Sequence, residues 1–289
     1  ISFSLKKYSI LGIIGESGSG KSLTALSILN ILKYKGLKQI GNIIYDGDNI
    51  TSYDSNQFRD FLKRDIGIIF QDPSSYLNPS LKCGVQMLEV LNQKSSKEFL
   101  SEILKKVKFS NPKEILNRYP HELSGGQKQR IMIAMMIAKN SKIIICDEAT
   151  SSLDALIKKE IIELLLDLKK EFELSMIFIS HNLKLIHKIC DEVVFLKNGK
   201  LVEKGNTTNV FKSPKSNYTK NLIELNFKPI VNKSKNEPTN KNLLIIEKLN
   251  LEINDFKILS EISFNLKRNE VLGIIGESGS GKTSIARCI

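Results

Sequence analysis

The sequence predicts an α/β fold in which a parallel sheet carries a phosphate-binding loop at its carboxyl edge. A β-branched run at residues 10–14 leads into a glycine-rich loop, and this loop opens into an apolar helix at residues 23–29. Strand, loop and helix in that order form the context in which the pattern GxxxxGK[ST] binds phosphate. Two later apolar runs, residues 143–146 and 176–179, are typical of parallel strands buried on both faces.

The glycine-rich loop is predicted to bind the phosphates of a nucleotide through its backbone. Glycines let successive amide N–H groups turn inward, and the N-terminus of the following helix adds its dipole. We expect Lys21 to reach the β- and γ-phosphates and the Ser22 hydroxyl to ligate Mg²⁺. The residues of this loop are Gly15, Glu16, Ser17, Gly18, Ser19, Gly20, Lys21 and Ser22.

The same loop occurs a second time, 261 positions later (276 − 15). It again follows a β-branched run, residues 271–275, which we expect to form a strand. Thr283 takes the position of Ser22 and is therefore expected to ligate Mg²⁺ in a second site. The second loop consists of Gly276, Glu277, Ser278, Gly279, Ser280, Gly281, Lys282 and Thr283.

The repeat extends beyond the loop and predicts two tandem domains. Residues 1–22 match residues 262–283 nearly position by position, and a repeat of this length has the size of a domain. We expect a first domain at residues 1–225, a polar linker at 226–242 and the start of a second domain at 243–289. Because the chain begins without Met in a strand-like run and ends within a predicted helix, we expect it to be part of a longer protein.

Composition narrows the class of protein. The chain has 289 residues, of which 41% are hydrophobic and 26% charged, which is typical of a globular protein. Its longest apolar run, residues 131–138, is shorter than the roughly 18 residues that span a bilayer. The net charge is +12, but the lysines are spread without an arginine-rich patch, so we expect no nucleic-acid partner. The four cysteines form no CxxC pair, which argues against a zinc site or a disulfide framework.

The remaining segments fit the same fold. Residues 41–48 alternate and end in an Asp-Gly turn, which predicts a strand, and residues 66–70 predict a short buried strand. Residues 74–140 are mostly helical in pattern. An amphipathic helix is expected after Asp154, and an Asn-Gly turn at residues 198–199 predicts a β-hairpin.

Six motifs follow one another along the chain: the phosphate-binding loop, Gln71 of a glutamine loop, LSGGQ at residues 123–127, Asp147-Glu148 after an apolar strand, the SSLD loop ending at Asp154, and His181. In this order and with this spacing they resemble the nucleotide-binding domain of an ABC transporter. The resemblance implies a RecA-like parallel-sheet core, an antiparallel β subdomain and a helical subdomain that carries the signature. It also implies ATP as substrate, Mg²⁺ as cofactor and hydrolysis coupled to transport across a membrane.

Four residues are expected to act on Mg²⁺, the γ-phosphate and the attacking water. Asp147 follows a strand placed beside the phosphate-binding loop, and its carboxylate is expected to hold Mg²⁺ with Ser22. Glu148 is expected to accept a proton from the water as general base, the alternative being a surface acid after a strand. The resemblance implies that His181 donates to the γ-phosphate. It also implies that Gln71 senses Mg²⁺ and water, although a lone histidine is usually structural and a lone glutamine only part of a loop.

The signature is expected to form a second anion site, because its serine and glycines open a helix. The resemblance implies that this site faces the γ-phosphate bound by the other domain, so that two domains pair head to tail around ATP. Phe256 lies 20 positions before the second loop (276 − 256), where the family stacks an aromatic ring on adenine; the alternative is a core aromatic. The nucleotide-binding residues implied by the signature and the SSLD loop are Ser124, Gly125, Gly126, Gln127 and Asp154.

Three segments resemble the ATPases of oligopeptide, dipeptide and nickel importers: residues 70–79, residues 118–127 and Asn217-Tyr218-Thr219-Lys220. The resemblance implies membrane permease subunits as partners, a solute-binding protein as an indirect partner, and a peripheral position on the cytoplasmic face of the membrane. Two alternatives are a soluble tandem ABC protein that acts on ribosomes or nucleic acid, which the charge of +12 suggests, and an exporter ATPase. The short linker and scattered cysteines favour the importer over the first alternative.

Overall fold

The computed structural model divides the described part of the chain into two compact units. The first unit is made of residues 1–153 and 157–228, and the second mainly of residues 229–289. None of the helices in the described stretches has the length and apolarity that a bilayer crossing requires. The described stretches are residues 1–32, 36–91, 96–151, 153–227, 241–253, 256–276 and 279–289.

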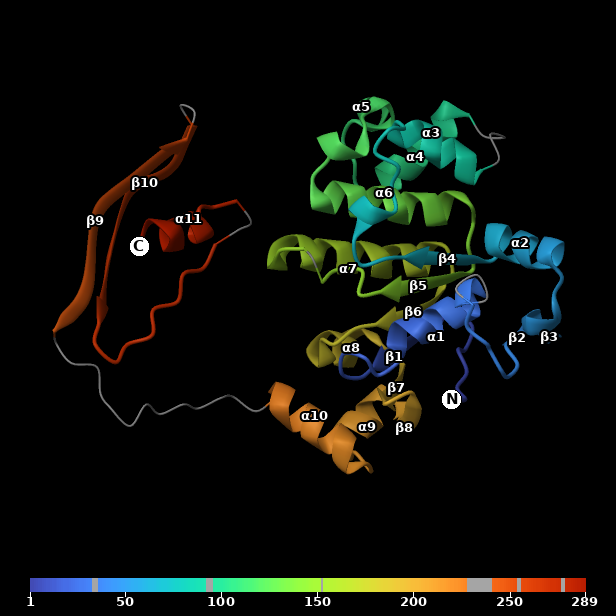
Figure 1. Cartoon of the computed structure of the whole chain (residues 1–289). Helices are drawn as coiled ribbons and strands as arrows, with labels where there is room; N and C mark the ends of the chain where they lie inside the picture. The colour runs from blue at the N-terminus through green and yellow to red at the C-terminus, as the bar shows by residue number, and fades with distance from the viewer. Residues whose placement is uncertain (33–35, 92–95, 152, 228–240, 254–255, 277–278) are drawn as a thin grey trace. The chain divides into compact units, whose positions relative to one another are not determined.

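A six-stranded sheet forms the centre of the first unit, with strand order β4-β5-β6-β1-β7-β8 (Figure 1). The five strands from β4 to β7 in this order are parallel, and β8 pairs antiparallel to β7. This arrangement confirms the predicted parallel-sheet core and brings the carboxyl ends of five strands to one edge. The strands are β1 (Ile10–Ile14), β4 (Ile66–Ile69), β5 (Ile143–Asp147), β6 (Ser175–Ile179), β7 (Glu192–Lys197) and β8 (Lys200–Asn206).

Both faces of this sheet are buried under helices, as a parallel sheet requires. Neighbouring residues of β5 point to opposite faces: Ile145 joins one apolar cluster, whereas Ile144 and Cys146 join the other. The first cluster includes residues of α1 and α2, and the second includes residues of α7 and α8. These helices are α1 (Lys21–Ile28), α2 (Ser55–Arg64), α7 (Ala155–Glu171) and α8 (Leu183–Ile189).

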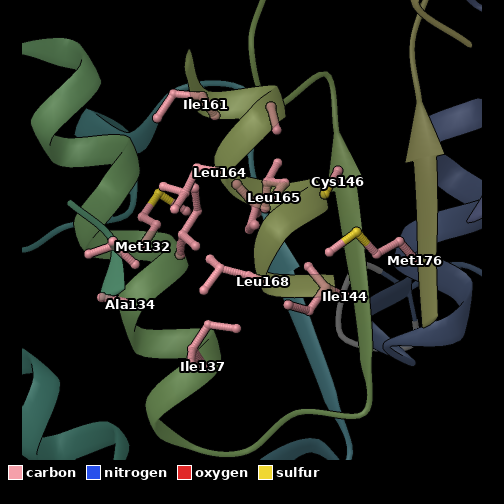
Figure 2. Packing of buried hydrophobic residues seen from close by; sticks show 14 of the residues in the cluster. Met132, Ala134, Ile137, Ile144, Cys146, Ile161, Leu164, Leu165, Leu168 and Met176 are labelled. Carbon is pink, nitrogen blue, oxygen red and sulfur yellow. The ribbon is translucent and has the colours of Figure 1, made fainter. Parts of the chain in front are cut away.

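A second helical layer lies on the far side of α7. Figure 2 shows Leu165 and Leu168 of α7 packed between Ile144 of β5 and residues of α6 such as Ile137. Full burial of one Leu or Ile side chain stabilises the folded state by about 1.5–3 kcal/mol relative to an exposed one. This layer is the predicted helical subdomain, and α6 carries the signature at its N-terminus. Its helices are α3 (Cys83–Val90), α4 (Lys97–Lys106), α5 (Pro112–Asn117) and α6 (Gly125–Ala138).

Short elements complete the first unit. The turn at Asn198 and Gly199 has positive φ at both residues, 49° and 71°, which joins β7 to β8 as the Asn-Gly pair predicts. The predicted strand at residues 41–48 is instead a hairpin of two-residue strands. The further elements are β2 (Ile44–Tyr45), β3 (Asp48–Asn49), α9 (Thr207–Lys212), α10 (Asn217–Phe227), and the 3₁₀ turns Ile50–Ser52, Pro73–Ser75 and Pro120–Glu122.

The second unit contains one long antiparallel pair, β9 (Asn242–Ile253) with β10 (Phe256–Lys267), and the helix α11 (Lys282–Cys288). The predicted strand at residues 271–275 is wrong, because these residues belong to no strand or sheet in the described part of the chain. Val271 and Ile275 are 97% and 96% exposed. In the first unit the equivalent run, β1, is hydrogen-bonded by β6 on one side and β7 on the other, and a strand needs at least one such partner for its backbone groups.

The first residues of the chain form no strand. Because the chain begins in a strand-like run, residues 1–3 are expected to lie within a strand. In the structure residues 262–264 belong to β10, whereas residues 1–3 belong to no strand. The partner that β9 gives to residues 262–264 has no equivalent for residues 1–3 among the described residues.

Candidate functional site

Four predicted site segments follow parallel strands and so lie at the same edge of the first unit's sheet. The glycine-rich loop follows β1, Gln71 follows β4, the pair Asp147-Glu148 ends β5, and His181 follows β6. The strand beside β1 is β6, and β5 lies one strand further away. The loop and Asp147 therefore meet across the end of β6.

The first glycine-rich loop has the shape of an anion cradle. Gly18 and Gly20 adopt φ values of 78° and 97°, which L side chains rarely take, and Gly20 caps the N-terminus of α1. The Nζ of Lys21 donates to the carbonyl oxygens of Gly15 (2.9 Å) and Glu16 (2.8 Å), which curls the loop around the ammonium group. Lys21 is only 7% exposed, and burial lowers its pKa. The negative charges of Glu148 and Asp147 act in the opposite direction, but more weakly. A phosphate would supply the negative charge that favours the protonated lysine.

Ser22 and Asp147 form a pair of oxygen ligands, although 125 residues separate them in sequence. The Ser22 hydroxyl donates to Asp147 Oδ1 at 3.1 Å. Burial raises the pKa of Asp147, and the neighbouring Glu148 charge raises it further, while Ser22 and Lys21 oppose the shift. A hydroxyl and a carboxylate are suitable ligands for Mg²⁺, so the residues present fit this ion. A bound cation would also favour the ionised form of this half-buried acid.

Glu148 turns away from Asp147 because its backbone is left-handed, with φ of 48°. Its amide donates to the Ile179 carbonyl oxygen at 3.0 Å, which ties it to the end of β6. There its Oε1 lies 3.3 Å from Nδ1 of His181. The side chains of Glu148 and His181 line a small pocket together with Lys158 of α7. Lys158 belongs to no recognised motif, so no signal in the sequence marks it. This pocket places a carboxylate and an imidazole where a water could be activated.

Asn182, next to His181, has a clear local role. Its Oδ1 accepts from the amide of Leu185 at 3.1 Å, so it caps α8. Asn and Asp are about equally good N-caps, so either residue can hold the start of this helix. The position of His181 at the end of β6 is therefore fixed from both sides, by the strand before it and by the capped helix after it.

The signature begins α6 with a reciprocal cap. The Ser124 Oγ accepts from the Gln127 amide at 3.3 Å, and the Gln127 side-chain oxygen accepts from the Ser124 amide at 3.0 Å. The side chain of Gln127 therefore orders the turn that presents the loop amides. Gly126 is required by packing, because a Cβ there would lie 2.7 Å from Cγ2 of Ile157.

Replacing Gly126 by Ala is expected to lower the free energy of unfolding by about 1–3 kcal/mol, because a stiff β-branched side chain meets the new methyl group. Gly125→Ala is the matched control. Its Cβ would meet Leu153 Cδ2 at an ordinary 3.5 Å, and alanine favours a helix over glycine, so its stability should hold or rise slightly. Urea unfolding of both variants measures the difference; equal stability would contradict the packing requirement.

The second loop repeats the backbone of the first where it is described. Gly279 and Gly281 have φ values of 83° and 86°, and Gly281 caps α11. Lys282 Nζ lies 3.4 Å from Ser280 Oγ. Thr283 is exposed in the first turn of α11, and Gly276 is the first residue of the loop. The predicted nucleotide contacts of Glu277 and Ser278 fall outside the described residues.

The remaining predicted site residues are placed without a defined role. Phe256 is the first residue of β10 and is 78% exposed, so it is not a core aromatic within the described part of the second unit. Gln71 is exposed directly beyond β4, and Asp154 directly precedes α7. Their contacts with nucleotide, Mg²⁺ or water stay predictions.

A parallel sheet, a lysine-bearing glycine loop and an acidic pair at one strand edge define a P-loop nucleotide-binding protein. The family model described as "ABC transporter" matches residues 1–151 and again residues 259–289. The chain therefore belongs to the ABC transporter family, and the family resemblance drawn from the motifs is confirmed.

Several relatives and solved structures are similar to the chain. The metal-staphylopine import system ATP-binding protein CntD of Staphylococcus aureus is 41% identical over 77% of the chain and 84% of its own length. The dipeptide transport ATP-binding protein DppD of Haemophilus influenzae is 37% identical over 77% of the chain and 69% of its length. A dimeric post-hydrolysis structure of the ATP-binding cassette MJ0796 with ADP and Pi matches with a TM-score of 0.60 and 27% identity, covering 71% of the chain and 88% of that structure.

One relative is matched over almost the whole chain. The peptidoglycan transport ATP-binding protein YejF of Agrobacterium fabrum is 35% identical over 99% of the chain, but the match covers 55% of YejF. The chain thus spans about half the length of this relative. The match to YejF therefore extends into the second unit, whereas the matches to CntD and DppD each cover 77% of the chain.

Proposed function

We propose that the chain forms part of an ATP-hydrolysing subunit that powers an importer of peptides or similar small solutes. The proposal is carried by two contacts at the carboxyl edge of the sheet: Ser22 contacts Asp147, and Glu148 contacts His181. One pair suits Mg²⁺ and the other suits the attacking water. Family membership and the names of the relatives support ATP as the nucleotide.

The chain's residues would divide phosphoryl transfer between them. The loop amides and Lys21 would hold the phosphates, and Ser22 and Asp147 would hold Mg²⁺, which neutralises charge when bound. Glu148 would accept the proton of the attacking water at its carboxylate. His181 would donate to an oxygen of the γ-phosphate, where charge increases during transfer. Gln71, beyond β4, would contact the water and Mg²⁺.

ATP would lie between two domains paired head to tail. In this arrangement the residues of the signature contact the γ-phosphate held by the loop of the partner domain, and Asp154 lines the same interface. The dimeric MJ0796 cassette with ADP and Pi supports such pairing. The repeated loop and the second match of the family model support a tandem arrangement within one protein, with residues 276–283 forming the other phosphate site and Phe256 stacking on adenine.

The importer class rests on the loop and tail motifs together with the named relatives, which are import or transport proteins. Neither a ribosome-acting or nucleic-acid-acting protein nor an exporter is supported by these names. The proposed partners are membrane permease subunits, with a solute-binding protein that delivers the solute to them. The proposed location is the cytoplasmic face of the membrane, where the subunit would bind the permeases as a peripheral protein.

Uptake of a labelled peptide mixture by source cells tests the proposal. Deletion of the gene should abolish ATP-dependent uptake of at least one peptide class, and the wild-type gene should restore it. A Glu148→Gln gene should not restore it, although its product should still copurify with permeases from solubilised membranes. Uptake that survives deletion, together with copurification of ribosomes instead of permeases, would refute the importer function.

A further inference from the structure

The first phosphate-binding loop is held from outside by the C-terminal part of the first unit. The Glu16 amide donates to the Tyr218 hydroxyl at 3.3 Å, and that hydroxyl donates to the Leu196 carbonyl oxygen, also at 3.3 Å. Leu196 belongs to β7, and Tyr218 lies in the first turn of α10. One hydroxyl therefore bridges the second residue of the loop and a strand of the central sheet.

A second contact holds the loop from the same side. The Gly199 amide, in the turn between β7 and β8, donates to the Ser19 carbonyl oxygen at 3.0 Å. The approach is close, because a Cβ on Gly15 would lie 2.4 Å from the Leu196 carbonyl oxygen. The loop backbone thus rests against the carboxyl end of β7 at both its first and its middle residues.

Tyr218 is itself fixed to the sheet. The buried Glu203 carboxylate of β8 accepts from the amides of Lys215 (2.9 Å) and Ser216 (3.0 Å), at the start of α10. The Tyr218 amide donates to Ser216 Oγ at 3.2 Å, and the ammonium of Lys197 lies 4.9 Å from the centre of the tyrosine ring. Burial raises the pKa of Tyr218, so its phenol stays protonated and able to donate to Leu196.

We propose that Tyr218 is a positioning residue that holds the loop in its phosphate-binding shape before nucleotide arrives. The inference rests on the proposed function, because it assigns the residue to the affinity of that same site for ATP. The Glu16 amide is directed to the phenol, which leaves the later amides of the loop for phosphate. A loop that is already ordered loses less conformational entropy on binding, so its affinity is higher.

Tyr218→Phe tests the proposal because it keeps the ring and removes only the hydroxyl. We expect the affinity for the Mg²⁺ complex of a β,γ-imido ATP analogue to fall roughly 3- to 10-fold, as for the loss of one neutral hydrogen bond. Amide exchange at Glu16 in the protein without nucleotide should become faster by a similar factor, while exchange in α10 stays unchanged. Tyr8→Phe is the matched control, since Tyr8 is 57% exposed and its hydroxyl lies outside these contacts.

The two measurements separate this inference from the proposed function. Wild-type affinity in Tyr218→Phe would overturn the positioning role, whether or not Glu16 exchanges faster, while loss of binding in Lys21→Ala would still support the nucleotide site. If wild-type protein fails to bind the analogue, the proposed function fails. In that case the exchange measurement alone tests the positioning role, and unchanged amide exchange at Glu16 in Tyr218→Phe would overturn it.

Discussion

Glu148→Gln in the full-length protein is expected to lower ATP turnover by roughly 10²- to 10⁴-fold, the usual contribution of a general base. ATP affinity should change little, because the amide has the shape of the carboxylate, and Glu148 contacts His181 through its side chain and the Ile179 carbonyl through its backbone. The geometry supports this separation: Glu148 is turned toward His181 by its left-handed backbone, whereas Ser22 binds Asp147. Steady-state phosphate release and equilibrium binding of ATP measure the two effects separately.

Glu163→Gln provides the matched control for the same chemical change. Glu163 lies on the exposed side of α7, 3.9 Å from Lys159, and an exposed ion pair of this kind contributes little to stability. Its turnover should equal that of the wild type. Normal turnover in Glu148→Gln would show that another group accepts the proton, and equal losses in both variants would point to a general effect of removing charge from this region.

Lys21→Ala should instead weaken ATP binding, by roughly 10- to 100-fold, because hydrogen bonds to a charged group contribute more than neutral ones. Two effects add. The ammonium that would bind the β- and γ-phosphates is lost, and the carbonyl oxygens of Gly15 and Glu16 lose the donor that curls the loop. Titration calorimetry with ATP and Mg²⁺ measures the affinity directly.

Lys105→Ala serves as the control for removal of a lysine, because Lys105 is exposed on α4. It should bind ATP like the wild type. Circular dichroism should show an intact fold in both variants, since burial already lowers the pKa of Lys21 and its removal takes a desolvated cation out of the interior. Undiminished affinity in Lys21→Ala would mean that the loop backbone alone holds the phosphates.

Several parts of the fold could be predicted because they depend on local sequence. The apolar runs that became β5 and β6 are buried on both faces, as their composition predicted. Glycines that need positive φ, such as Gly20, mark the loop whatever its surroundings. The Asn-Gly turn between β7 and β8 follows the same logic, since two residues with positive φ suffice to reverse the chain.

Other predictions were wrong or incomplete because pairing is not local. The run at residues 271–275 resembles β1 closely, yet among the described residues only β1 is paired into a sheet, by β6 and β7. The insertion of β6 between β1 and β5 also escaped prediction, because the order of parallel strands depends on how crossover helices pack. Neither property is encoded in the hydrophobic period of a single segment.

Short stretches of sequence specify the kind of site: a phosphate loop, an acidic pair and a signature, each recognised from residues close together in the chain. Which groups meet depends on the folded arrangement. It joins Ser22 to Asp147, turns Glu148 to His181, and holds the loop with Tyr218, over 200 residues away. The physical reason is that a motif records local backbone geometry, whereas contacts between distant segments depend on strand order and helix packing across the whole sheet.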